Sequence, residues 1–182
     1  TLMGKLLLNA NKYALTSWWD QKGFEGTTRQ EYLNLRGTTE HKIRPIAAMA
    51  QSLAVSLRLN LYNQAVTGVQ RAEAEAKTVQ LIRTLAHQHR ANMGVGGWGR
   101  MWQSAMWAGY TAYAGWVMWD KLDKKTKREL VKMIHFECDW VISDKNKKMF
   151  KLYRDRSGKI ISKGDTGAEE NAWDAYMLGL AS

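Results

Sequence analysis

The chain contains little cysteine and proline, and it lacks a long apolar run. Its 182 residues include one cysteine, Cys138, and one proline, Pro45. A single cysteine excludes a disulfide framework within the chain, and the apolar helical stripe around Cys138 indicates a buried, unreactive thiol. No apolar stretch approaches the roughly 20 residues of a membrane-spanning helix, so we expect no membrane association.

Acidic residues are also scarce relative to basic ones. Lys and Arg number 27 and Asp and Glu number 17, which gives a net charge of +10 at pH 7. Such a charge favours partners that carry carboxylate, sulfate or phosphate groups. The nine tryptophans supply flat rings that suit the faces of sugars or bases, although core packing is their ordinary role.

Apolar residues recur at helical spacing along most of the chain. The segments that read as helices are 2–18, 45–61, 67–91, 98–119, 124–142 and 166–180. The second begins near Pro45 in this prediction, because proline lacks an N–H donor and disfavours helical geometry in the residue before it. Residues 147–162 instead predict a small β-hairpin, with a turn at 155–158.

The helical segments alternate between two types. Those that begin near 45, 98 and 166 are apolar on most sides, whereas 67–91 and 124–142 are apolar on one side only. This alternation predicts an all-α fold of helical hairpins, arranged as an (α/α) toroid or partial toroid, with a plain helical bundle as the competing arrangement. We expect one helical domain over residues 1–182, which could be a fragment of a larger toroid.

In a toroid the inner helices run parallel, so their amino ends meet in one cleft. The segment before the first inner helix contains His41, whose imidazole suits proton transfer near neutral pH. Arg44 and Asn171 could neutralise a substrate carboxylate, Arg44 through its guanidinium fork and Asn171 through its amide. The competing interpretations are a surface histidine without function and a salt bridge between Arg44 and Glu40.

Two carboxylates offer a different chemistry. Glu40 and Glu170 form a candidate acid and base pair for glycoside hydrolysis. Glu169 is better explained by a capping box with Thr166, in which its carboxylate accepts backbone hydrogen bonds at the helix start.

Aromatic and amide side chains complete the predicted cleft. Trp98 and Trp102 are four residues apart, so in a helix they share a face, and with Gln103 they could stack on and hydrogen-bond to a sugar ring. Core packing is the competing interpretation for both rings.

Three further patterns carry no functional prediction. Residues 94–99 match GxGxxG but follow a helix rather than a strand, which removes the nucleotide interpretation. His87 and His89 project about 200° apart on a helix, which is poor geometry for one metal ion. The lysines after residue 120 indicate a solvated outer face, and we rank nucleic acid as an unlikely partner. We therefore assign no metal and no cofactor.

Short motifs resemble those of a known group of enzymes. Thr39-Glu40-His41, Gly97-Trp98-Gly99 and Glu169-Glu170-Asn171-Ala172-Trp173, in this order of inner and outer helices, resemble bacterial (α/α)-toroid polysaccharide-degrading enzymes of the heparinase II/III-like lyase type. The resemblance lies at superfamily level. It implies Tyr or His as acid and base, and Asn, Gln, His or Arg against a uronate carboxylate. It also implies an extracellular or periplasmic location.

The sequence thus predicts a carbohydrate-active enzyme that cleaves an acidic, uronate-containing polysaccharide by β-elimination. The alternatives are a glycoside hydrolase that uses Glu40 and Glu170, and a non-catalytic helical module that binds glycans or nucleic acids. The oligomeric state is left open.

Overall fold

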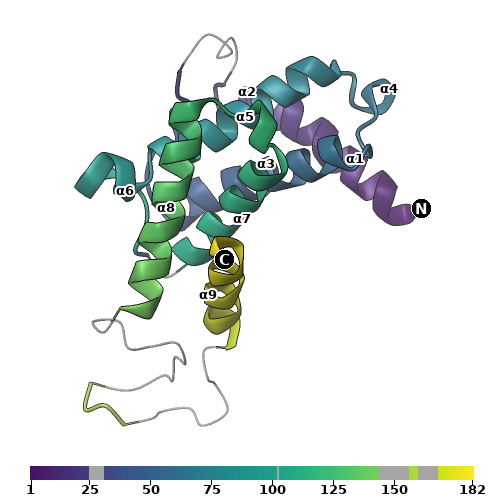
Figure 1. Ribbon diagram of the computed structural model, residues 1–182. Coiled ribbons are helices and arrows are strands. Elements are labelled where there is room, and N and C mark those ends of the chain that lie inside the picture. Colours follow the sequence, from purple (N-terminus) through teal and green to yellow (C-terminus); the bar gives the residue numbers. More distant parts are fainter. Residues whose placement is uncertain (25–30, 102, 144–155, 160–167) are drawn as a thin grey trace.

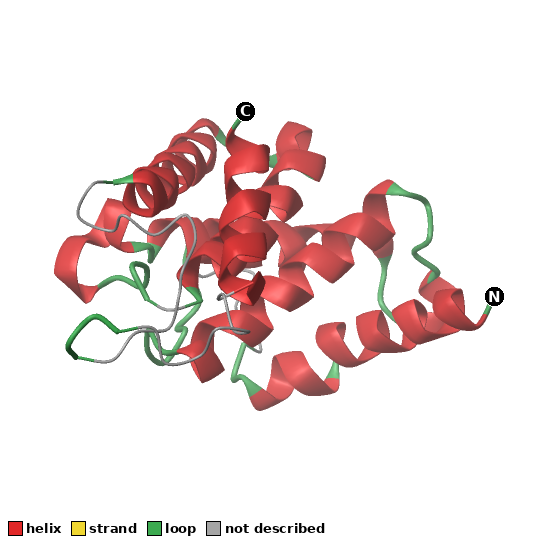
Figure 2. Cartoon of the chain, turned by 90° about the horizontal axis from the view of Figure 1, so that it is seen from below, coloured by secondary structure: helices red, strands yellow, loops and turns green. Residues whose placement is uncertain are grey.

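The computed structural model describes residues 1–24, 31–101, 103–143, 156–159 and 168–182, and in these ranges the secondary structure is helical (Figures 1 and 2). The predicted all-α class is confirmed. The α-helices are α1 (Leu2–Leu15), α2 (Ser17–Gln21), α3 (Glu40–Arg58), α4 (Gln64–Thr67), α5 (Arg71–His87), α6 (Arg90–Met93), α7 (Ser104–Val117), α8 (Lys124–Ile142) and α9 (Ala168–Ala181). Two short 3-10 turns are η2 (Gly94–Gly96) and η3 (Trp119–Lys121).

Two helix starts differ from the prediction. Helix α3 begins at Glu40, so the prediction that Pro45 marks its first turn is wrong. Pro45 lies in the second turn, where its missing N–H removes the bond to the His41 carbonyl, and burial of Ile43 and Ile46 offsets that loss. Helix α7 begins at Ser104 rather than near Trp98.

Helix α5 is buried more deeply than its sequence predicts. It packs against α3, α7 and α8, so three neighbouring helices cover much of its surface. Ala72 and Ala76 remain exposed. Lys77 is buried instead, and its Nζ lies 2.9 Å from the Leu15 carbonyl and 2.9 Å from Glu73 Oε1. The ammonium is tolerated there because it has both partners.

The contacts between helices run in two rows. Helix α3 packs most extensively on α7, which packs on α9, whereas α5 packs on α8 (Figure 1). Arg58 at the end of α3 forms an ion pair with Asp120 just after α7, with Nη2 3.1 Å from Oδ1. The carboxyl ends of α3 and α7 therefore meet, which makes these two helices parallel.

Small residues let α7 approach its neighbours closely. A Cβ atom on Gly109 would lie 2.7 Å from the Tyr176 ring of α9, and one on Gly115 would lie 2.2 Å from Leu130 of α8. Helix α7 is therefore held between α8 and α9 at distances that glycine alone permits.

The predicted hairpin at 147–162 lies largely outside the described residues. Within 156–159 the chain forms a turn, with Gly158 at a φ of 86°, in agreement with the predicted turn position. As for membranes, none of the described helices combines the length and the apolar character that crossing one requires.

Candidate functional site

The amino ends of α3 and α7 lie at the same end of the molecule. Their carboxyl ends are joined by Arg58 and Asp120, and at 1.5 Å per residue their lengths are about 28 Å and 21 Å. Two hydrogen bonds connect further segments to this end of the molecule. Gln88 donates from Nε2 to the Leu33 carbonyl at 2.6 Å, and Trp98 N–H donates to the Gln88 carbonyl at 3.1 Å. The segment before α3 and the loop before α7 are thus tied together through the end of α5.

His41 lies in the first turn of α3 with its side chain exposed to solvent. Beside it, Arg44 Nη1 lies 2.9 Å from Glu40 Oε1, and the two side chains are 51% and 32% exposed. The salt bridge considered for Arg44 is therefore present. A pair this exposed contributes about 0–1 kcal/mol, so a substrate carboxylate could replace Glu40 as the partner of Arg44.

Trp98 lies in the core of the protein. Its side chain is fully buried, and its Nε1 donates to the Leu85 carbonyl at 2.9 Å. Both faces of the ring are covered, so the prediction that Trp98 is a stacking surface for a sugar is wrong. The ring is buried because the backbone of Trp98 pairs with the backbone of His89, which places the side chain in the core.

Of the other predicted site residues, the structure describes the side chains of Gln103 and Asn171 only. Gln103 is 5% exposed, and among the described residues its Oε1 accepts no hydrogen bond. Asn171 is partly buried in the first turn of α9. Trp102 and the side chains of Glu169 and Glu170 lie outside the described residues, and so do the Thr166 capping box and the Glu40–Glu170 separation.

Tyrosines from α7 and α9 meet on the inner row of helices. Gln51 of α3 donates from Nε2 to the Tyr176 hydroxyl oxygen at 3.1 Å, and Tyr110 and Tyr113 lie near enough to raise the pKa of Tyr176. Burial raises the pKa of Tyr176 and outweighs the hydrogen bond with Gln51, which lowers it. The phenol is therefore protonated at neutral pH, the state that a general acid requires.

A buried hydrogen bond between His89 and Glu137, which the sequence did not predict, lies beside the loop before α7. His89 Nε2 is 2.9 Å from Glu137 Oε1, and both side chains are fully buried. The amide of Ala91 donates to His89 Nδ1 at 3.1 Å, which leaves Nε2 as the donor to Glu137. The two residues are 48 positions apart, with His89 between α5 and α6 and Glu137 in α8, so no local motif could have revealed the pair.

The Gly97-Trp98-Gly99 motif is explained by this packing. A Cβ atom on Gly97 would lie 2.5 Å from the Arg90 nitrogen, and one on Gly99 would lie 2.4 Å from His89 Nε2. Gly99 also has a φ of 124°, which L side chains rarely adopt. The glycines therefore let the loop lie directly against His89 and Glu137.

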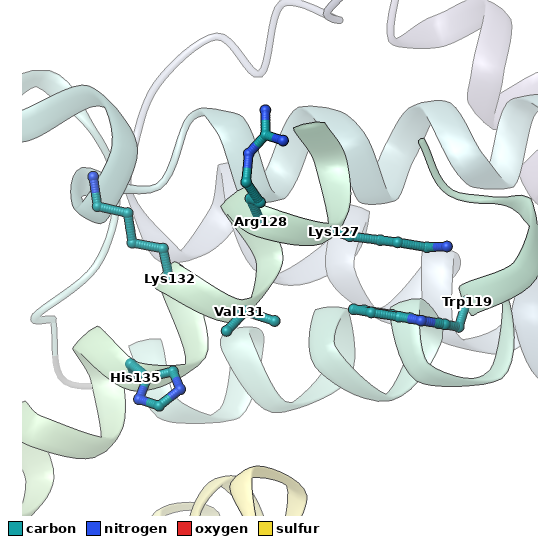
Figure 3. Close-up of a pocket in the computed structure, with 6 residues that line it drawn as sticks. All are labelled: Trp119, Lys127, Arg128, Val131, Lys132 and His135. Carbon is teal, nitrogen blue, oxygen red and sulfur yellow. The ribbon is translucent and has the colours of Figure 1, made fainter. Parts of the chain in front are cut away.

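A basic groove lies on the outer side of α8 (Figure 3). It is an open hollow of about 490 Å³ lined by Trp119, Lys127, Arg128, Val131, Lys132 and His135. Lys127 Nζ lies 5.2 Å from the centre of the Trp119 ring, and the figure shows the lysine chain running along that ring. The groove thus combines an apolar base with cationic groups at its edge, and its residues belong to the lysine-rich face that the sequence assigned to solvent.

Comparisons with known proteins identify no relative. No family model matches the chain, and neither the curated proteins nor the solved structures contain a match.

Proposed function

We propose that this chain is the helical part of an (α/α)-toroid polysaccharide lyase that cleaves an acidic, uronate-containing polysaccharide by β-elimination. The observation that carries the proposal is the parallel arrangement of α3 and α7, since it places the exposed His41 at the same end as the loop that precedes α7. The net charge of +10 supports an acidic substrate.

Elimination requires removal of a proton from the carbon next to the uronate carboxylate. In the proposed reaction His41 takes this proton and the electron pair forms a carbon–carbon double bond. The bond to the glycosidic oxygen then breaks, and that oxygen takes up a proton from the imidazolium. Negative charge develops on the carboxylate meanwhile, and nearby donors must stabilise it.

Arg44 and Asn171 are the proposed donors to that carboxylate. Arg44 is available because its ion pair with Glu40 is exposed and weak. Gln103 is proposed to position the sugar ring, because its buried Oε1 accepts no hydrogen bond among the described residues and a sugar hydroxyl could donate to it. Trp98 has no part in this proposal.

The test is incubation of the chain with alginate, polygalacturonate, hyaluronan, chondroitin and heparin, with two readouts. Near-ultraviolet absorbance detects the unsaturated product of elimination, and a reducing-end assay detects any cleavage. We expect absorbance with at least one substrate, a loss of about 100-fold or more in His41→Gln, and no loss in the α1 surface control Lys5→Gln. Reducing ends without absorbance would favour hydrolysis by Glu40 and Glu170, and silence in both assays would overturn an enzymatic function.

The groove on α8 favours a second candidate, a non-catalytic module for anionic glycans. The apolar face of a sugar ring suits Trp119 and Val131, and its charged groups suit the cations at the edge. If this candidate holds, the double variant Arg128→Gln/Lys132→Gln should elute from heparin at clearly lower salt than Lys5→Gln/Lys12→Gln, which loses the same charge from α1. Equal shifts would indicate a general charge effect, and equal competition by single-stranded RNA would indicate a polyanion surface.

A further inference from the structure

We propose that Arg100 is a binding residue for the carboxylate of the acidic sugar, held ready by two aromatic rings of α8. The inference rests on the proposed function for the identity of its ligand. Arg100 precedes α7 by four residues, at the end of the molecule that carries His41. The sequence did not single it out as a site residue.

The backbone of Arg100 is fixed by the buried carboxylate of Glu137. Arg100 N–H donates to Glu137 Oε1 at 3.1 Å, and Ser104 Oγ donates to the other oxygen, Oε2, at 2.7 Å. Arg100 has a φ of 56°, a left-handed conformation that is uncommon for a residue other than glycine. Strained backbone of this kind persists only where the surroundings enforce it, and it is frequent at ligand sites.

The guanidinium is fixed as well. Its Cζ lies 4.6 Å from the centre of the Phe136 ring and 4.9 Å from the centre of the Trp140 ring, which are one turn apart on α8. Aromatic stacking restricts the side chain and leaves the N–H groups at the guanidinium edge free to donate. A pre-ordered side chain loses less conformational entropy when it binds a ligand.

The charge of Arg100 is not neutralised by an acidic side chain in the part of the chain that the structure describes. Arg83 differs in this respect, since its guanidinium pairs with Asp123 at 2.9 Å. Arg100 forms no such pair, although its side chain is exposed to solvent. An exposed, pre-ordered guanidinium without a carboxylate is suited to bidentate binding of an anion from solution.

The test measures binding by calorimetry and does not depend on turnover. The probes are oligogalacturonate and its methyl-esterified form, with heparin oligosaccharide as a sulfated alternative. We expect Arg100→Gln to bind oligogalacturonate about tenfold more weakly or worse, and Arg100→Lys to recover part of the loss, because lysine keeps the charge and lacks the fork. The methyl ester should bind both proteins equally weakly.

Lys5→Gln in α1 is the charge control, because it removes one positive charge from a surface with no role in either candidate, and Arg128→Gln tests the groove on α8. Equal weakening in the Arg100 and Lys5 variants would show an effect of net charge alone and would overturn the inference. Weakening in Arg128→Gln alone would place the ligand in the groove and overturn it too. A third outcome is that heparin binding depends on Arg100 and oligogalacturonate binding does not. The ligand of Arg100 would then be a sulfate group, which would overturn the assignment to a carboxylate.

The aromatic rings supply a second, independent measurement. As positioning residues they should matter for affinity even though they carry no charge: Trp140→Leu should weaken oligogalacturonate binding several-fold, and Trp140→Phe should retain most of it. Unchanged thermal unfolding midpoints in the Arg100 variants would show that they fold. If wild-type protein binds through Arg100 but makes no unsaturated product, the proposed lyase function fails while this site stands. If unsaturated product forms and Arg100→Gln binds oligogalacturonate like wild type, the Arg100 site fails while the proposed lyase function stands.

Discussion

Glu137 and His89 meet in the interior of the protein, with Oε1 2.9 Å from Nε2 and no exposure of either side chain. Burial by itself raises the pKa of Glu137. The hydrogen bonds from His89, Ser104 and the Arg100 amide outweigh burial and hold the pKa below its ordinary value. Glu137 is therefore ionised at neutral pH and joins α8 to the loop before α7.

Removal of this carboxylate should destabilise the protein strongly. Glu137→Ala leaves His89 Nε2, Ser104 Oγ and the Arg100 amide without their acceptor, and we expect a loss of about 3–5 kcal/mol in the free energy of unfolding. Glu137→Gln keeps one carbonyl acceptor and should lose about 1–3 kcal/mol. Urea denaturation followed by circular dichroism measures both, and a loss below about 1 kcal/mol in the alanine variant would contradict the role given to Glu137.

The contribution of Glu137 should also depend on pH. Because folding lowers its pKa from 4.5, the ionised group stabilises the folded state fully above about pH 4.5, and this contribution is lost as the pH falls through the folded-state pKa. The difference in stability between wild type and Glu137→Gln should therefore be constant near neutral pH and shrink in acid. Denaturation curves at several pH values check this, and a difference that grows in acid would reverse the sign of the pKa shift.

The loop glycines should differ sharply in their tolerance of alanine. Gly99→Ala places a methyl group 2.4 Å from His89 Nε2 at a φ of 124°, and we expect a loss of about 2–4 kcal/mol. Gly96→Ala in the same loop meets nothing within 4 Å and should change stability by less than about 0.5 kcal/mol. Thermal unfolding of the two variants side by side makes the comparison, and similar midpoints would refute it.

Helix α7 should reject added volume at its contact with α9. Gly109→Ala brings a methyl group to 2.7 Å from the Tyr176 ring and should destabilise by about 1–3 kcal/mol. Gly179→Ala in α9 meets nothing within 4 Å and should stabilise by roughly 0.5–1 kcal/mol through helix propensity. Opposite signs in chemical denaturation are the expected result. Stabilisation by both variants would mean that α7 and α9 are not in close contact.

Cys138 should be unreactive in the folded protein. Burial, together with the neighbouring charges of Asp139 and Glu137, raises its pKa to about 11. At pH 8 roughly one thiol in a thousand is then ionised. A chromogenic disulfide reagent should label Cys138 slowly in buffer and rapidly in urea, whereas rapid labelling in buffer would show that the thiol is accessible.

Much of the fold could be predicted because the periodic spacing of apolar residues along the chain indicates a helix. The predicted bounds of 124–142 agree with α8, and those of 166–180 lie within two residues of α9. The start of α3 was predicted wrongly because of Pro45. The free energy gained by burying the apolar residues around Pro45 exceeds the cost of a proline inside the helix. The packing of α5 against α3, α7 and α8 buries Lys77, whose charge had indicated an outer position, and leaves Ala72, Glu73 and Ala76 exposed.

The candidate site could be predicted only in part. The residue types at the helix starts gave His41, Arg44 and Gln103, but the sequence assigned Trp98 to a ligand, and the structure buries it completely. A tryptophan between two glycines has the same local pattern in a binding loop and in a core. Its burial follows from contacts with residues 85–90, which periodicity does not contain.

The sequence alone determined the composition of this protein, its excess of positive charge and the positions of most of its helices, because these depend on residues that are close together in the chain. The tertiary structure decided that α3 and α7 run parallel, that Glu137 reaches His89 and that Arg100 lies over Phe136 and Trp140. Each of these relationships joins residues that are far apart in the chain, and only the packing of whole helices can bring such residues together.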